Sequence, residues 1–133
     1  MLLTRRFAFS AAHRLASDQL DPAAQADCYG PCTRIHGHNY RLEVAVRGQS
    51  DPRTGFFANV MTLDRIVRTR IVDACDHQTL NDLPLFAGRI VTMETIAEVV
   101  WRTVQEPLAE AGMTLASVLV AETDEHWVTL TAE

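Results

Sequence analysis

Apolar and polar residues alternate along residues 2–13 with the period of two that is typical of a β-strand. The apolar side of this predicted strand ends in a histidine and carries Leu3, Phe7, Phe9, Ala11 and His13. A second alternation begins at residue 36, and its apolar face carries His36, His38, Tyr40, Leu42, Val44 and Val46. Both predicted strands therefore present histidines in phase with apolar positions.

The segments after these strands have other patterns. Residues 14–35 contain Pro22, Gly30 and Pro31 with little periodicity, which predicts a loop. The run 50–55 predicts a turn, after which residues 56–60 could return as the second arm of a hairpin. Apolar residues then recur every three or four positions over 63–74 and over 96–108, which predicts two amphipathic helices, the second capped by Thr92.

Alternation returns at residues 118–122 and 127–131 and predicts two short final strands. The order of two strands, two helices and two strands indicates an α+β class, with an antiparallel four-stranded sheet covered on one face by two helices. At 133 residues the chain has room for a single domain, spanning 1–133. The uncovered sheet face and the sheet edges would need a partner subunit, so we expect a homo-oligomer.

Composition narrows the function classes. The hydrophobic fraction of 47% and charged fraction of 22% are those of a globular protein, and neither a membrane span nor an export signal is recognisable, so we expect a cytoplasmic protein that uses no membrane. The formal net charge of −5 disfavours nucleic acid as a partner. All twelve basic residues are arginine, so mechanisms that need a lysine Schiff base are excluded. The odd count of three cysteines argues against a disulfide framework.

The strongest candidate for chemistry is a metal site. His36 and His38 stand two residues apart on a strand, so both imidazoles project to the same side. Zinc binds neutral imidazole nitrogens, and a catalytic zinc site keeps three protein ligands with a fourth position open. His13 has the right phase to be the third ligand.

A rival site uses the neighbouring thiols. Cys28, Cys32, His36 and His38 together have the composition of a closed structural zinc site, as in a zinc-stabilised oligomeric binding module. That alternative leaves His13 without a role.

Further titratable residues are candidates for proton transfer and binding. Asp76 and His77 are adjacent, and a carboxylate can orient an imidazole and raise its basicity. A thiol near zinc and arginines, such as Cys32, could act as a base. Glu122 is in phase with Val118 and Val120, so its carboxylate would be costly on the covered face unless it met N–H donors such as those of a ligand.

These residues resemble the 6-pyruvoyl-tetrahydropterin synthase and 6-carboxytetrahydropterin synthase family. The resemblance covers nearly the whole chain, in the family's order, and it rests on the runs Phe9-Ser-Ala-Ala-His13-Arg, Cys32-Thr-Arg-Ile-His36-Gly-His38-Asn-Tyr, Thr54-Gly55 with Asn59, Asp76-His77-Gln-Thr-Leu-Asn81, Thr92-Met-Glu94 and Glu122-Thr123.

The resemblance implies the tunnelling fold, or T-fold, whose subunits join their sheets into a trimeric barrel that is often stacked as a hexamer. It implies zinc (Zn²⁺) as the cofactor and a pterin triphosphate, 7,8-dihydroneopterin triphosphate, as the substrate. Its implied residue roles are zinc ligation by His13, His36 and His38, proton abstraction by Cys32, a proton relay of Asp76 and His77 from a neighbouring subunit, and pterin binding by Glu122 with Thr92 and Glu94.

Two products are compatible with this constellation. Three residues separate Cys32 from His36, a short spacing that resembles the carboxy branch, which also cleaves the side chain and releases acetaldehyde on the route to queuosine. We therefore favour a 6-carboxytetrahydropterin synthase, with the pyruvoyl branch as the alternative. Cys28 and Met93 depart from the family's usual pattern. Arg14 and Arg34 are close in sequence to the three histidines and are the candidate arginines for binding the triphosphate.

Overall fold

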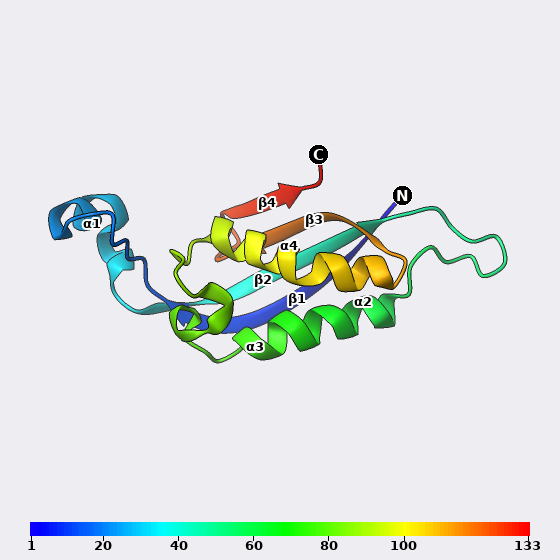
Figure 1. Ribbon diagram of the computed structural model, residues 1–133, viewed down its shortest axis with the longest axis horizontal. Coiled ribbons are helices and arrows are strands. Elements are labelled where there is room, and N and C mark those ends of the chain that lie inside the picture. Colours follow the sequence, from blue (N-terminus) through cyan, green and yellow to red (C-terminus); the bar gives the residue numbers. More distant parts are fainter.

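The computed structural model describes all residues from Met1 to Glu133. Its core element is a four-stranded antiparallel sheet in the order β1-β2-β3-β4, so each strand pairs with its neighbour in the chain (Figure 1). This confirms the predicted sheet. The strands are β1 (Leu2–His13), β2 (His36–Arg47), β3 (Thr114–Ala121) and β4 (Trp127–Thr131).

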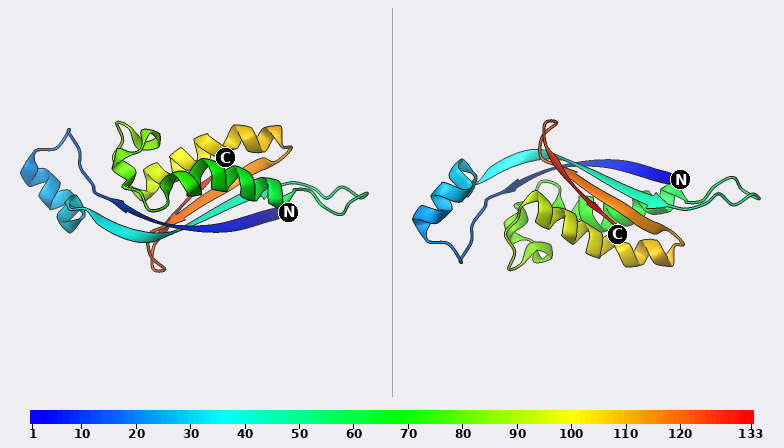
Figure 2. Two further views of the ribbon diagram at one scale, coloured as in Figure 1. Left: turned by 90° about the horizontal axis from the view of Figure 1, so that it is seen from below. Right: turned by 90° about the horizontal axis from the view of Figure 1, so that it is seen from above.

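The helices cover one face of the sheet and leave the other bare (Figure 2). The first predicted helix spans α2 (Val60–Val67), a π-helical turn (Arg68–Val72) and α3 (Asp73–Cys75), while the second is α4 (Met93–Glu110). Thr92 caps α4 as predicted, because its side chain accepts a hydrogen bond from the Thr95 backbone N–H. Short 3₁₀ turns at Leu80–Asp82 and Pro84–Phe86 connect α3 to α4 along the chain.

Two local predictions were wrong. The supposed loop 14–35 contains α1 (Pro22–Tyr29) and a 3₁₀ turn (Gly30–Thr33), because Asp21 caps the first helix and Pro22 suits its first position. The supposed hairpin arm at 56–60 is absent. Asn59 instead accepts hydrogen bonds from the N–H groups of Met61 and Thr62 and so starts α2 at that point.

Apolar side chains fill the layer between the sheet and the helices. Phe7, Tyr40 and Leu42 point into it from β1 and β2, and each is at most 2% exposed. The opposite face of the same strands carries a line of ion pairs from Arg6 through Glu43 to Arg41. This division follows from the alternation of side chains along a strand, and it places the candidate histidines on the covered side.

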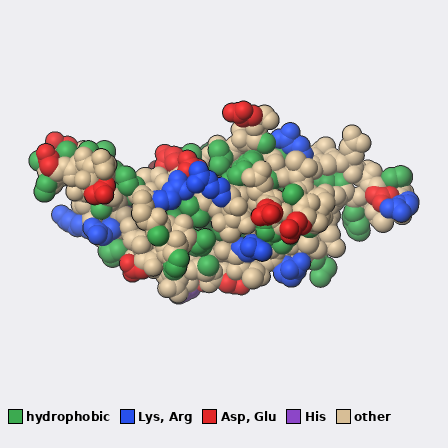
Figure 3. Space-filling model, in the orientation of Figure 1, with side chains coloured by type: hydrophobic (Ala, Val, Ile, Leu, Met, Phe, Trp, Pro, Cys, Tyr) green, Lys and Arg blue, Asp and Glu red, His purple; other side chains and the backbone are tan.

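The outer surface carries charges of both signs. Acidic and basic side chains are interspersed over the helical face (Figure 3). No helix is long and apolar enough to cross a membrane.

Candidate active site

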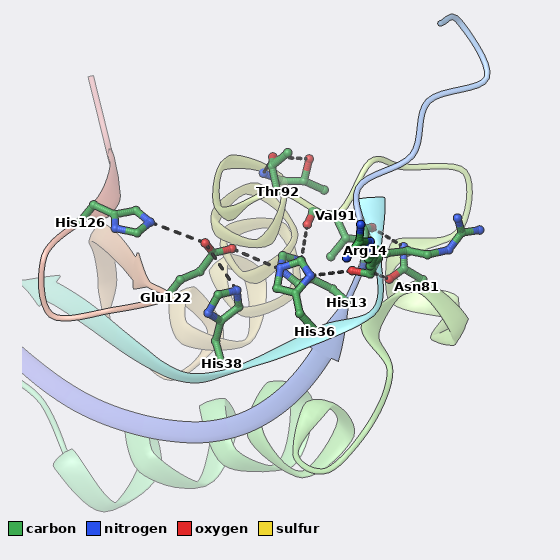
Figure 4. A network of polar contacts seen from close by, with 11 residues as sticks. His13, Arg14, His36, His38, Asn81, Val91, Thr92, Glu122 and His126 are labelled. Atoms are coloured by element: carbon green, nitrogen blue, oxygen red, sulfur yellow. Dashed lines mark hydrogen bonds and ion pairs between the residues drawn. The ribbon is translucent and has the colours of Figure 1, made fainter. Parts of the chain in front are cut away.

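Three histidines meet where β1 ends and β2 begins. The register pairs His13 with His36 and Ala11 with His38, so the three imidazoles share one end of the covered sheet face (Figure 4). One ligand nitrogen from each histidine lies within 4.8 Å of the others. The set could hold a metal ion, and it includes His13 and no cysteine.

Hydrogen bonds to the backbone determine which nitrogens face the cluster. The Nδ1 of His13 is 2.8 Å from the Val91 carbonyl oxygen, and the Nδ1 of His36 is 2.7 Å from the Arg34 carbonyl oxygen. Because a carbonyl oxygen can only accept, both Nδ1 atoms carry the proton and both Nε2 atoms are left as lone pairs. This arrangement is the one found around metal-bound histidines, whose second nitrogen donates to a carbonyl or carboxylate.

Burial favours the neutral forms of His13 and His38. Burial is the main cause that lowers the pKa of His13, outweighing the opposing effects of the Val91 carbonyl and Glu122, and burial likewise lowers the pKa of His38. The Nε2 atoms of both side chains are buried and have no hydrogen-bond partner. A buried polar atom without a partner is costly, and a metal ion would satisfy both nitrogens. The residues therefore fit a zinc ion.

Glu122 follows the last residue of β3 and lies against this cluster. Its carboxylate oxygens are 3.6 Å from His13 Nε2, 3.8 Å from His38 Nε2 and 3.7 Å from His126 Nε2. The Glu122 side chain is 15% exposed, so its remaining lone pairs require donors from a ligand or water. A cavity of about 440 Å³ borders Glu122, and its lining includes Gly37, His38 and Arg41.

Asp76 and His77 lie at the outer edge of β1 instead. The Asp76 carboxylate accepts a hydrogen bond from the Ser10 N–H at 2.9 Å, and the His77 N–H donates to the Ser10 carbonyl at 2.6 Å. These contacts hold His77 at φ +59°, a left-handed conformation that is uncommon outside glycine. The hydrogen bonds from Ser10 and then His77 lower the pKa of Asp76. The second Asp76 carboxylate oxygen lies 2.9 Å from His77 Nδ1, and the side chains are 41% (Asp76) and 81% (His77) exposed. Neither joins the histidine cluster.

The remaining predicted residues are not part of the histidine cluster. Cys32 is half-buried in the segment before β2, where its carbonyl accepts from the Leu15 N–H, whereas Cys28 is exposed. Thr92 is half-buried directly after Val91, and Glu94 is exposed in the first turn of α4. Arg14 is held by a reciprocal pair of hydrogen bonds between its backbone and the Asn81 side chain.

Sequence reasoning missed two contributors. The Val91 carbonyl that orients His13 is a backbone group, so no residue pattern identifies it. His126 lies in the turn before β4, where neither strand nor helix periodicity assigns a direction to its side chain. Its spacing of four residues from Glu122 was the only signal in the sequence.

The fold and the site together define a class of protein: a T-fold subunit with a cluster of three histidines that could hold a metal ion. The family model described as 6-pyruvoyl tetrahydropterin synthase matches residues 2–133. The chain belongs to this family.

Individual relatives agree with that assignment. The chain is 35% identical over 134 residues to the 6-pyruvoyl tetrahydrobiopterin synthase of Dictyostelium discoideum, covering 100% of this chain and 97% of the relative. A solved 6-pyruvoyl tetrahydropterin synthase from Caenorhabditis elegans superposes with a TM-score of 0.92 at 29% identity, covering 100% of this chain and 96% of that one. An Archaeoglobus fulgidus protein with the provisional name 6-carboxy-5,6,7,8-tetrahydropterin synthase is 28% identical, covering 96% and 92% of the two chains.

Proposed function

We propose that the protein is a zinc-dependent lyase that acts on 7,8-dihydroneopterin triphosphate. The observation that carries this proposal is the cluster of His13, His36 and His38, in which backbone carbonyls hold two Nδ1 protons so that the Nε2 lone pairs converge. Family membership supplies the substrate class, because the matching family model and the similar proteins are pterin synthases.

The three histidines would hold the ion. When bound, zinc supplies a Lewis acid that polarises substrate oxygens and makes their protons easier to remove. Three neutral imidazoles leave the positive charge of the ion uncompensated, which suits an oxygen-rich substrate side chain.

Glu122 is the proposed anchor for the pterin ring. An ionised carboxylate accepts hydrogen bonds only, and the amino and ring N–H groups of a pterin present two donors side by side. Because Glu122 is 15% exposed and no protein N–H group donates to it at hydrogen-bond distance, the ligand would meet an unsatisfied acceptor. Thr92 and Glu94, at the start of α4, are proposed to complete this pocket.

Cys32 and the pair Asp76 and His77 are the proposed proton carriers. In one chain the pair is exposed at the edge of β1 and lies outside the histidine cluster. A site that uses the pair would therefore take it from a neighbouring copy. The Ser10 contacts hold Asp76 and His77 at this edge.

Assembly into a trimer, or a hexamer of stacked trimers, is proposed on the same grounds. β1 and β4 are the two edge strands. Residues 76–79 already cover the edge of β1 at Ser10 and Ala12, and the backbone groups along the open remainder of an edge pair readily with another strand. Joining β4 of one copy to the β1 side of the next would remove both edges and bring the exchanged residues to the site.

The product could be of either branch. The name of the Dictyostelium relative supports 6-pyruvoyltetrahydropterin, formed by triphosphate elimination and internal rearrangement. The short segment between Cys32 and His36 supports the carboxy branch that the sequence favoured, as does the more distant archaeal relative. The comparisons thus support the carboxy branch less strongly than the pyruvoyl branch.

The test is turnover by the zinc-loaded protein. Incubation with 7,8-dihydroneopterin triphosphate should release triphosphate, and mass spectrometry of the pterin, with an assay for acetaldehyde, identifies the branch. A pyruvoyl pterin without acetaldehyde establishes the first branch, and a carboxylated pterin with acetaldehyde establishes the second. Bound zinc without turnover would refute the enzyme proposal and favour a binding module.

Two cysteine variants test the rival metal site. Cys32→Ala should keep zinc at one ion per chain while losing turnover, and Cys28→Ala is the matched control that should keep both. Loss of zinc from both variants would show that the thiols bind the metal and would refute the assignment of Cys32 as a base.

A further inference from the structure

His126 contacts Glu122, the proposed pterin anchor, and has no role in the mechanism proposed above. It belongs to the turn between β3 and β4, and its Nε2 is 3.7 Å from a Glu122 carboxylate oxygen (Figure 4). At that separation the contact is electrostatic, and a shift of a few tenths of an ångström would make it a hydrogen bond. The His126 side chain is 56% exposed, so it has room to make that shift.

A short chain of hydrogen bonds through the Thr123 hydroxyl favours one tautomer of His126. The Thr123 hydroxyl accepts a hydrogen bond from the Glu125 N–H at 3.2 Å and lies 3.0 Å from His126 Nδ1. If the hydroxyl proton points to Nδ1, then Nε2 bears the hydrogen and presents a donor to the Glu122 carboxylate. The opposite tautomer would turn an Nε2 lone pair toward a carboxylate, which is repulsive. The favoured arrangement therefore aims an N–H donor at Glu122.

The other imidazoles near Glu122 cannot take this part once a metal is bound. His13 gives its Nδ1 proton to the Val91 carbonyl, so its Nε2 is a lone pair. His38 belongs to the metal-capable cluster and its Nε2 is buried without a hydrogen-bond partner, so we assign this nitrogen to the ion. Of the three imidazoles around the carboxylate, His126 alone is free to donate.

We propose that His126 is a positioning residue that holds the Glu122 carboxylate in the orientation in which it accepts the N–H groups of the pterin ring. This inference rests on the proposed function. It assigns a role in substrate binding to His126, which is not among the residues identified by the family resemblance.

The test compares His126→Phe, which keeps a ring without a donor, with His126→Gln, whose side-chain amide restores an N–H. His126→Phe should raise KM for 7,8-dihydroneopterin triphosphate about fivefold, the scale expected for one partly exposed contact between an N–H donor and a carboxylate, with kcat within twofold of the wild type. His126→Gln should restore most of the loss. Glu125→Gln, in the same turn, is the matched control and should behave as the wild type.

Binding of 7,8-dihydroneopterin, followed by its fluorescence, separates ring recognition from triphosphate recognition. The fivefold weakening should persist with this probe and should vanish when His126→Phe is introduced into a Glu122→Gln background. Zinc content should stay at one ion per chain in every variant.

The outcomes are distinguishable from failure of the proposed function. If the wild type does not turn over the substrate, the proposed function fails first. If the wild type is active but His126→Phe keeps the wild-type KM and Kd, or weakens binding equally in the Glu122→Gln background, the positioning role is refuted. Loss of zinc from His126→Phe would also overturn it, because His126 would then act on the metal.

Discussion

Replacing Tyr40 with phenylalanine should stabilise the protein, although Tyr40 is among the most buried side chains. Its ring is 1% exposed and stacks on Phe9 with centroids 5.1 Å apart, directly beside His13 and His38. Its hydroxyl is buried without a hydrogen-bond partner. Tyr40→Phe keeps the ring and its stacking and removes only the hydroxyl.

The size of the effect follows from the cost of burying that group. An unpaired hydroxyl in an apolar interior costs about 1–3 kcal/mol in protein mutational data. Tyr40→Phe should therefore raise the free energy of unfolding by about 1 kcal/mol or more, equivalent to a Tm increase of roughly 3–10 °C for a chain of this length. Burial also raises the pKa of Tyr40, so its phenol should not ionise before the protein unfolds.

Urea unfolding of the zinc-loaded protein, at one fixed protein concentration, measures the change. Tyr29→Phe is the matched control, because Tyr29 is half-buried in α1 and its hydroxyl is not among the unpaired groups. Zinc content should be unchanged in both variants. A loss of stability in Tyr40→Phe of 1 kcal/mol or more would refute the reasoning and show that the hydroxyl has a partner in solution.

Three further predictions concern charge and packing. The metal-free protein should lose stability as the pH falls below 6.5, because the pKa values of His13 and His38 are lowered in the folded state and the unfolded chain therefore binds more protons. A free energy of unfolding in urea that stays constant between about pH 8 and pH 5 would contradict this. Asp76→Asn should be less stable than the wild type at neutral pH, and the gap should close as the pH falls below 3.8, since the lowered pKa of Asp76 stabilises only its ionised form; thermal melts across that range test this. Leu42→Ala should cost about 2–5 kcal/mol in urea unfolding, because Leu42 is 0% exposed, whereas a cost under about 1 kcal/mol would show that the core collapses around the cavity.

The strands and the main helices were predictable because their burial is one-sided. Leu42 and Val44 in β2 alternate with Arg41 and Glu43, and this alternation survives unchanged in the sheet. The errors occurred where burial gives no pattern. α1 has no buried residue, so only the cap at Asp21 marked it, and the wrong hairpin arm lacked any signal stronger than the turn before it.

The grouping of the three histidines was predictable from the sequence, and their surroundings were less so. His36 and His38 follow from spacing alone, and His13 follows from strand phase. The carbonyls of Val91 and Arg34, which orient two of these imidazoles, depend on the path of the chain in space and leave no trace in residue identity. His126 was hidden for a related reason, because a turn has no periodicity from which a side-chain direction can be inferred.

The register between β1 and β2 links the proposed metal site to the proposed exchange of residues between copies. His13 pairs with His36, so both imidazoles lie on the covered face, and a slip of one residue would turn one of them to the bare face. The same register leaves Ser10 on the outer edge of β1, where its backbone groups bind Asp76 and His77. β1 thus carries His13 on the covered face of the sheet and holds Asp76 and His77 at its outer edge through Ser10. A change that shifts β1 should therefore impair both the proposed metal binding and the proposed contribution of Asp76 and His77 to a neighbouring site.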